Sequence, residues 1–125
     1  MTRLIQVCTT TNTRGNAAAI ARAAVEQRLA ACAQIAGPIT STYWWKGKIE
    51  TSREWVCMFK TRRTKFTALA AAIKARHPYE TPEIIAVDIA AGSPDYLAWI
   101  AFETRTRKKH GANVRTQVPP PRRRR

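Results

Sequence analysis

The clearest candidates for chemistry in this sequence are a histidine and two acids between residues 77 and 83. A neutral imidazole at His77, with a carboxylate nearby at Glu83, could ligate Cu²⁺, and a thiolate at Cys8 would suit Cu⁺. A structural interpretation competes with this one. At the end of a predicted helix, His77 can interact with the last carbonyl groups, and a small thiol such as Cys8 is common in a strand core. The residues alone leave both interpretations open.

The sequence contains few signals for other ligand-binding or catalytic chemistry. Tyr79 and Glu80 are candidates for lining a small-ligand cleft. Glu80 and Glu83 could form an acid–base pair, but no nucleophile is placed near them. The sequence contains no GxSxG, P-loop or GxGxxG motif, and it lacks the CxxC or His-rich spacing of a preformed zinc site. We therefore expect no catalytic residues and no enzymatic activity, and any metal to be copper or another divalent cation.

The segment 43–50, YWWKGKIE, has an unusual composition. Tandem tryptophans lead into a Lys-Gly-Lys turn, which is typical of the tip of a long β-hairpin. Large aromatic side chains at such a tip need a covering surface, and tryptophan is enriched in desolvated contacts. We predict that Tyr43, Trp44, Trp45 and Lys48 belong to an oligomer interface; a platform on which a ligand stacks is the alternative.

Local signals predict the elements that must position these residues. Thr13, Thr61 and Ser93 are expected to cap helices, Pro78 to end one, and Gly37-Pro38 to interrupt a strand with a bulge or bend. In chain order, the expected elements are a strand at 4–9, a helix at 14–31, an extended strand at 32–45, a returning strand that ends at 60, a helix at 61–77, a strand at 83–89 and a helix from 93.

This order predicts an α+β fold, the ferredoxin-like β-α-β-β-α-β sandwich with an extra C-terminal helix and a long hairpin between its second and third strands. Both main helices would cover one face of the sheet. The third strand, however, is apolar on both sides, with Cys57 and Phe59 on one side and Val56 and Met58 on the other. An uncovered apolar sheet face marks an interface, so we expect an oligomer that packs its sheet faces inward.

Composition divides the 125 residues into a domain at 1–103 and a tail at 104–125. The formal net charge is +14, and residues 104–125 hold nine Lys or Arg and no acid. Such a segment is expected to be disordered, and residues 105–125 could contact polyanions without sequence preference. No apolar run is long enough to span a membrane, no signal peptide is evident, and the three cysteines fit reduced thiols, so the expected location is the cytoplasm.

Several motifs together resemble the CutA, or divalent-cation tolerance, family over residues 3–102. They are Leu29-Ala30-Ala31-Cys32, the segment 43–50, Lys60-Thr61, HPYETPEII at 77–85, and Gly92 with Tyr96-Leu97-Ala98-Trp99. The resemblance implies a fold similar to the PII signalling proteins, a tight homotrimer and a function in metal response. It also implies copper ligation through Cys8 and His77. Arg76 stands where some members carry a second histidine, which puts that ligation in doubt.

Two other classes compete with metal tolerance. One is a PII-like trimer that senses a small ligand in the clefts between subunits and has no metal function. The other is a nucleic-acid-associated protein, because RNA-binding RRM domains share this topology. The RRM signature places aromatic residues after a Lys/Arg-Gly pair, whereas here Lys46-Gly47 is followed by Lys48-Ile49. Only the basic tail therefore supports a nucleic-acid-associated protein.

Overall fold

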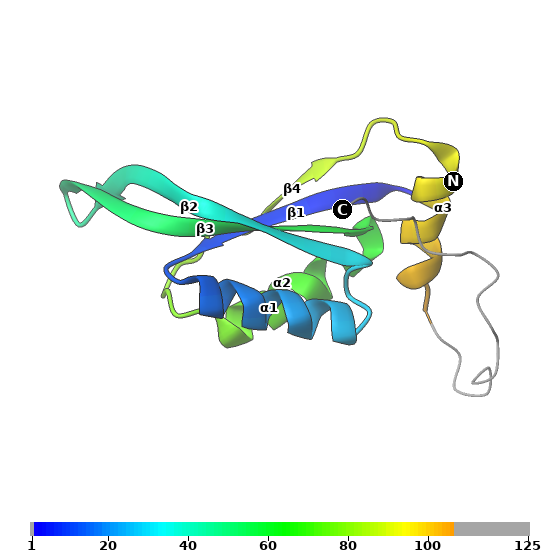
Figure 1. The fold of residues 1–125 in the computed structure, drawn as a ribbon, viewed down its shortest axis with the longest axis horizontal. Helices are drawn as coiled ribbons and strands as arrows, with labels where there is room; N and C mark the ends of the chain where they lie inside the picture. The colour runs from blue at the N-terminus through cyan, green and yellow to red at the C-terminus, as the bar shows by residue number, and fades with distance from the viewer. Residues whose placement is uncertain (1, 107–125) are drawn as a thin grey trace.

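The computed structural model describes residues 2–106, and Figure 1 shows their arrangement. In chain order, the elements are β1 (Leu4–Thr11), α1 (Arg14–Glu26), β2 (Cys32–Trp45), β3 (Lys48–Arg62), a 3₁₀ turn (Arg63–Lys65), α2 (Phe66–Arg76), β4 (Ile85–Asp88) and α3 (Pro94–Glu103). The strands form one antiparallel sheet in the order β2-β3-β1-β4. This is the predicted ferredoxin-like α+β topology.

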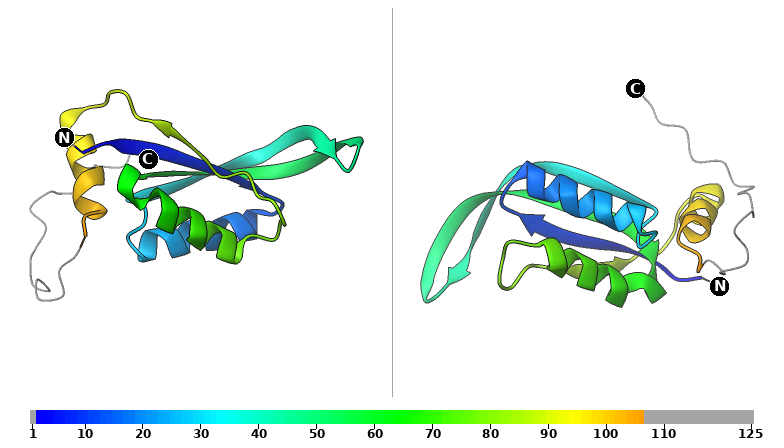
Figure 2. Two further views of the ribbon diagram at one scale, coloured as in Figure 1. Left: turned by 180° about the vertical axis from the view of Figure 1, so that it is seen from behind. Right: turned by 90° about the horizontal axis from the view of Figure 1, so that it is seen from below.

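The core lies between the sheet and the pair α1 and α2, which run side by side on one face (Figure 2). Strand alternation sends every second residue of β1 and β3 toward the helices. The small residues of α1 let this helix lie close to the strands, while α2 contributes larger side chains. The buried cluster comprises Ile5, Val7, Ala17, Ile20, Ala24, Ala30, Cys57, Phe59, Leu69 and Ile73.

The β2–β3 hairpin extends beyond the rest of the sheet (Figure 1). Its turn at Lys46 and Gly47 has positive φ at both positions, 51° and 79°, which matches the twist of the strands that it joins. The predicted irregularity at Gly37-Pro38 is confirmed, because the register shifts between Ala36 and Ile39. A side chain at Gly37 would meet the Trp55 ring, since a Cβ there would lie 2.6 Å from Trp55 Cδ1. Glycine therefore permits this bulge.

Helix α1 ends at Glu26, well before the predicted end at residue 31. The Arg28 N–H donates to the Val25 carbonyl and the Leu29 N–H to the Ala24 carbonyl, while Arg28 has φ 61°. This is the Schellman type of helix ending, with arginine where glycine is usual. The early end is required by the sheet, because the Ala31 N–H already donates to the Lys60 carbonyl. The alanine-rich sequence carried no local signal for it.

The prediction that Thr61 caps the second helix is wrong. β3 continues to Arg62, and Thr61 pairs with Ile5 of β1 in the sheet. The Thr61 side chain is completely buried, and its hydroxyl has no hydrogen-bond partner in the described part of the chain. Helix α2 begins only at Phe66, after the 3₁₀ turn, without a side-chain cap. Pairing with β1 has overridden the local capping signal.

The remaining boundaries agree better with the sequence. Thr13 caps α1, because its Oγ1 accepts a hydrogen bond from the Asn16 N–H at 3.0 Å. Helix α2 ends at Arg76, before Pro78, as predicted. Helix α3 begins with Pro94 after Ser93, but the Ser93 side chain makes no capping bond. The fourth strand is shorter than predicted and covers only Ile85–Asp88. None of the helices in residues 2–106 has the length and apolar character needed to cross a membrane.

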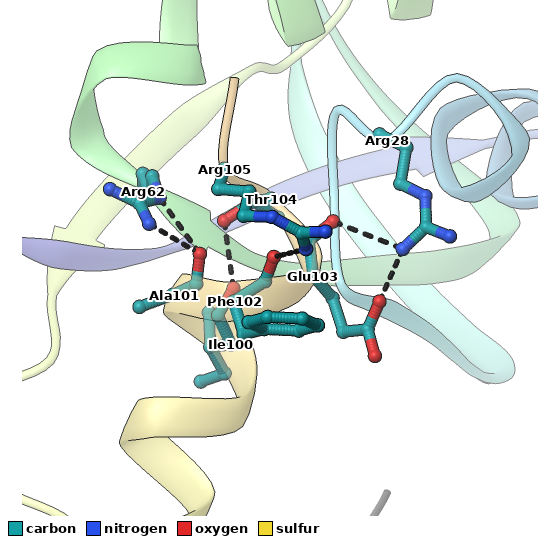
Figure 3. Close-up of polar contacts among 8 residues, drawn as sticks. All are labelled: Arg28, Arg62, Ile100, Ala101, Phe102, Glu103, Thr104 and Arg105. Atoms are coloured by element: carbon teal, nitrogen blue, oxygen red, sulfur yellow. Dashed lines mark hydrogen bonds and ion pairs between the residues drawn. The ribbon is translucent and has the colours of Figure 1, made fainter. Parts of the chain in front are cut away.

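Arg62 and Arg28 hold the C-terminal end of α3 at the end of the sheet opposite the hairpin tip, and Arg105 caps that helix end locally (Figures 1 and 3). Arg62 donates to the Ala101 carbonyl at 3.0 and 2.5 Å, and Arg105 donates to the Phe102 carbonyl at 2.7 Å. Arg28 binds both the carboxylate and the carbonyl of Glu103. Guanidinium groups satisfy carbonyls that have no partner within the helix and complement the negative end of its dipole.

The packed domain continues slightly past the predicted boundary at residue 103. Thr104 is fully buried, and its hydroxyl donates to the Ile100 carbonyl at 2.7 Å. Arg105 lies over the Phe102 ring, 3.8 Å from its centroid. The rest of the predicted tail, residues 107–125, lies outside the described residues.

Candidate functional site

A groove of about 750 Å³ lies between the hairpin and the α2–β4 loop. Its lining, here called the hairpin groove, comprises residues 41–45, residues 79–83, Thr10 and Glu54. Three of the eight acids in the chain line it: Glu54, Glu80 and Glu83. Although the chain contains 22 Lys and Arg, none is among the described lining residues. The groove therefore has a local charge opposite to that of the whole protein and favours a cation over an anion.

The most buried acid of the groove is Glu54, whose exposed fraction is 6%. Its Oε2 accepts a hydrogen bond from the Tyr79 hydroxyl at 2.6 Å. Burial raises the pKa of the Tyr79 phenol well above its ordinary value, and the hydrogen bond and negative charge of Glu54 raise it further, with a smaller contribution from Tyr43. Tyr79 is thus kept neutral as the donor to Glu54, which ties the loop to β3.

His77 joins the same loop to β1. Its Nδ1 accepts a hydrogen bond from the Tyr79 N–H at 3.1 Å, so the neutral ring carries its proton on Nε2, which donates to the Thr10 carbonyl at 2.8 Å. The backbone N–H of His77 also donates to the Lys74 carbonyl at 3.3 Å. With both ring nitrogens engaged, His77 acts as a structural link, and it must release a partner before it can ligate a metal.

The other expected metal ligands lie nearby in the fold without forming a cluster. Cys8 is half-buried in β1, two residues before Thr10, and pairs with Met58 and Ile85 in the sheet. Glu83 is exposed and lines the hairpin groove. In residues 2–106, no group of three or more His, Cys, Asp or Glu side chains could hold a metal ion. The set of His77, Cys8 and Glu83 therefore stays a prediction.

The two remaining cysteines are core residues. The Cys57 thiol is fully buried and donates to the Ala17 carbonyl at 3.4 Å, and burial raises its pKa to about 11. The Cys32 sulfur lies 3.6 Å from the Tyr96 hydroxyl, between β2 and α3. A buried thiol with a raised pKa is a poor nucleophile and a poor metal ligand.

The predicted interface residues lie at the hairpin tip. Trp44 is 71% exposed, Tyr43 and Trp45 are 41% and 44% exposed, and Lys48 is exposed as well. The Tyr43 hydroxyl lies 3.1 Å from Ser52 Oγ, and Lys46 Nζ is 5.6 Å from the centroid of the Trp45 ring. These contacts leave most of the aromatic surface open to a partner or ligand.

A second apolar surface lies on the sheet face opposite α1 and α2, here called the open sheet face. Val56 and Met58 of β3 and Cys8 of β1 share this face because they alternate with core residues. On β4, Ile85 and Val87 pair with Cys8 and Gln6 and are 52% and 55% exposed. The sequence analysis expected such a surface on the third strand.

Two residues of the candidate site, Glu54 and Thr10, were not predicted from the sequence. One signal existed for Glu54, since it is a lone acid directly before the apolar run Trp55-Val56-Cys57. Its partner Tyr79 is 25 residues away in the chain, and Thr10 lies 67 residues from His77. These contacts depend on tertiary packing, so sequence spacing could not reveal them.

The fold and the site define a ferredoxin-like domain with an extended aromatic hairpin and an acidic groove alongside it. The sequence pattern of the family described as "CutA1 divalent ion tolerance protein" matches residues 5–103. The chain therefore belongs to the CutA1 divalent ion tolerance family, and the resemblance seen in the sequence is confirmed.

Individual relatives agree with this assignment. The divalent-cation tolerance protein CutA of Thermus thermophilus is 44% identical over 85 residues, which is 68% of this chain and 82% of that protein. The solved structure of a divalent cation tolerance protein from Thermus thermophilus matches with a TM-score of 0.80 and 39% identity, and covers 82% of this chain and 99% of that chain. The CutA1 structure from Oryza sativa matches with a TM-score of 0.81 and 36% identity, and covers 83% and 95%.

Some relatives are longer than this chain. The CutA homolog of Xenopus laevis is 47% identical over 81 residues, but these make up only 54% of its length. The chain likewise spans about half the length of the mouse, rice and human relatives that it matches.

Proposed function

We propose that this protein acts in divalent-metal homeostasis or metal response as a homotrimer in the cytoplasm, and that it binds copper or another divalent cation. The match of residues 5–103 to the divalent ion tolerance family is the observation that carries the proposal. The acidic hairpin groove supports a cationic ligand, because three carboxylates line it and none of its described lining residues is basic. The proposal assigns no catalytic step.

The trimer is supported by the two apolar surfaces. Ile85 and Val87 leave more than half of their surface in water on the open sheet face, and Trp44 does so at the hairpin tip. Burial of such side chains stabilises association by roughly 25 cal/mol per Å² of apolar area, before the costs of association are subtracted. Light scattering of the purified full-length chain should give the mass of three chains. A soluble monomer at micromolar concentration would contradict this part of the proposal.

Copper should bind through His77, with Cys8 or Glu83 as a second ligand. The affinity should be modest, because the imidazole must first release the Thr10 carbonyl or the Tyr79 N–H. Binding should weaken on acidification, since a protonated imidazole cannot ligate a metal.

Calorimetric titration of the tag-free protein with Cu²⁺, Cu⁺ and Zn²⁺ tests this assignment. His77→Ala should abolish copper binding, while His110→Ala, the matched control at the only other histidine, should retain it. Equal copper uptake by wild type and His77→Ala would reject His77 as a ligand.

The size of the hairpin groove favours a second candidate, a PII-like trimer that senses a small ligand. A volume of about 750 Å³ is ample for a metabolite, and Tyr79 and Glu80 lie among its lining residues. The three carboxylates disfavour nucleotides and other polyphosphates. The same calorimeter can therefore separate the candidates: an organic cation that binds without metal would support the sensor, and binding of metal alone would support metal tolerance.

A further inference from the structure

The hairpin groove and the C-terminal sequence have complementary chemistry. The groove carries Glu54, Glu80 and Glu83, with no basic residue among its described lining residues. The chain ends in Pro119-Pro120-Pro121 followed by four arginines, residues 122–125. Planar guanidinium groups bind carboxylates through paired hydrogen bonds, so each acid of the groove offers a partner for one arginine of this segment.

The aromatic wall of the groove adds a second form of complementarity. Tyr43, Trp44, Trp45 and Tyr79 all line the groove. Proline-rich segments dock in aromatic-lined grooves, because prolines present a flat apolar surface and lose little conformational entropy on binding. Arginine side chains also stack on aromatic faces. A groove that combines aromatic rings with acids suits a segment that combines prolines with arginines.

We propose that the hairpin groove is the docking site for the chain's own C-terminal segment, residues 118–125. The prolines contact the aromatic residues of the hairpin, and the arginines pair with Glu54, Glu80 and Glu83. The segment comes from the same chain. This proposal rests on the proposed function in two respects: Glu83 is shared with the proposed metal site, and the contacts of the proposed trimer must leave the groove open.

The connecting chain is long enough for this contact within one molecule. Residues 107–118 can span about 40 Å when extended, at roughly 3.3–3.6 Å per residue. The tail leaves the domain next to α3, whose Ala101 carbonyl is bound by Arg62 at the end of β3. The eight residue steps along β3 from Arg62 to Glu54 cover about 26 Å. Tyr43 of the aromatic wall pairs with Glu50, twelve residue steps from Arg62 or about 40 Å, so the prolines reach it when residues 107–118 are almost fully extended.

Docking would have a functional consequence. The arginines that could bind nucleic acid or another polyanion would be occupied by the groove. The same segment would compete with any small cation for Glu54, Glu80 and Glu83. The tail would thus act as an intramolecular competitor for the ligand site of the domain, released when a polyanion binds the arginines.

A binding experiment with a fluorescent peptide of residues 117–125 tests the proposal. The receptor is the full-length chain with Arg122→Ser, Arg123→Ser, Arg124→Ser and Arg125→Ser, which keeps the domain intact and frees the groove. Fluorescence anisotropy should show saturable binding. Adding Glu80→Gln and Glu83→Gln to the receptor should weaken it by about tenfold or more, since two charge-assisted contacts are lost. Both side chains are exposed, so these changes leave folding intact.

Three controls decide the outcome. Glu26→Gln removes one negative charge from α1, outside the groove lining, and should leave peptide affinity unchanged. A peptide with serines in place of Pro119, Pro120 and Pro121 keeps its charge and should bind several-fold more weakly. The wild-type chain, whose own tail occupies the groove, should bind the peptide more weakly than the arginine-free receptor.

The proposal is overturned by any of three results. One is equal affinity for the groove variant and the Glu26→Gln control, which would mean general electrostatic attraction. Another is equal affinity for the proline and serine peptides, which would mean that the aromatic wall is not used. The third is equal affinity of the wild-type chain and the arginine-free receptor, which would mean that the tail does not occupy the groove in the intact protein.

Discussion

The hydrogen bond between Tyr79 and Glu54 should contribute measurably to stability. Replacement by Tyr79→Phe removes the hydroxyl and leaves a carboxylate that is only 6% exposed without this donor at 2.6 Å. Hydrogen bonds to charged groups contribute about 1.5–3 kcal/mol, and loss of one partner leaves the buried group unsatisfied. Because Tyr79 is half-buried beside a groove that admits water, we expect a loss near the lower value, about 1.5 kcal/mol.

The pKa of Tyr79 supplies an independent signature. Burial and the Glu54 carboxylate raise this pKa, so the folded state favours the neutral phenol. The resulting stabilisation is complete below the ordinary tyrosine pKa of 10.0 and is lost as the pH rises above it toward the folded-state value. Absorbance of the phenolate should show a tyrosine that titrates late, and this transition should disappear in Tyr79→Phe.

Chemical denaturation at a fixed protein concentration is the assay, because association also contributes to apparent stability. A double-mutant cycle with Glu54→Gln isolates the pair and should give a coupling of about 1 kcal/mol or more. Tyr43→Phe is the control for stability, since its hydroxyl makes a solvent-exposed hydrogen bond with Ser52 and its loss should cost less than about 0.5 kcal/mol. A coupling below about 0.5 kcal/mol, or an unchanged late titration in Tyr79→Phe, would refute the reasoning.

Three further predictions concern the core and the helix end. Thr61→Val should raise the free energy of unfolding by about 1 kcal/mol, because it removes a buried hydroxyl without a hydrogen-bond partner. Chemical denaturation measures the change. A less stable variant would show that this hydroxyl does have a hydrogen-bond partner. Arg28→Gly should be about 1 kcal/mol more stable than Arg28→Ala. Both variants lose the contact with Glu103, but only glycine adopts the positive φ of 61° without strain. Equal stabilities of the two variants would show that Arg28 is not strained. For Cys57, the raised pKa means that its stabilisation is complete below about pH 9 and is lost as the pH rises through about 11. Cys57→Val should therefore lose less stability than wild type across that interval.

Sequence reasoning succeeded where a short segment determines its own conformation. Thr13 caps α1 with its own side chain, and Pro78 excludes the helical conformation for the residue before it. Pro94 also acts locally, because its fixed backbone φ angle suits the first turn of α3. The Lys46-Gly47 turn and the alternating strands around it likewise specify a hairpin without help from the rest of the chain.

Only the tertiary structure decided how distant segments meet. Thr61 carries a helix-capping side chain, but pairing with Ile5 draws it into β3 because many backbone hydrogen bonds along a ladder outweigh one cap. Helix α1 ends early because the next residues must reach β2. Glu54 and Tyr79 become partners only when the α2–β4 loop packs beside the hairpin, and His77 turns to the Thr10 carbonyl for the same reason. The backbone conformation of a short segment depends on a few neighbouring residues, whereas these contacts depend on the packing of the whole sheet.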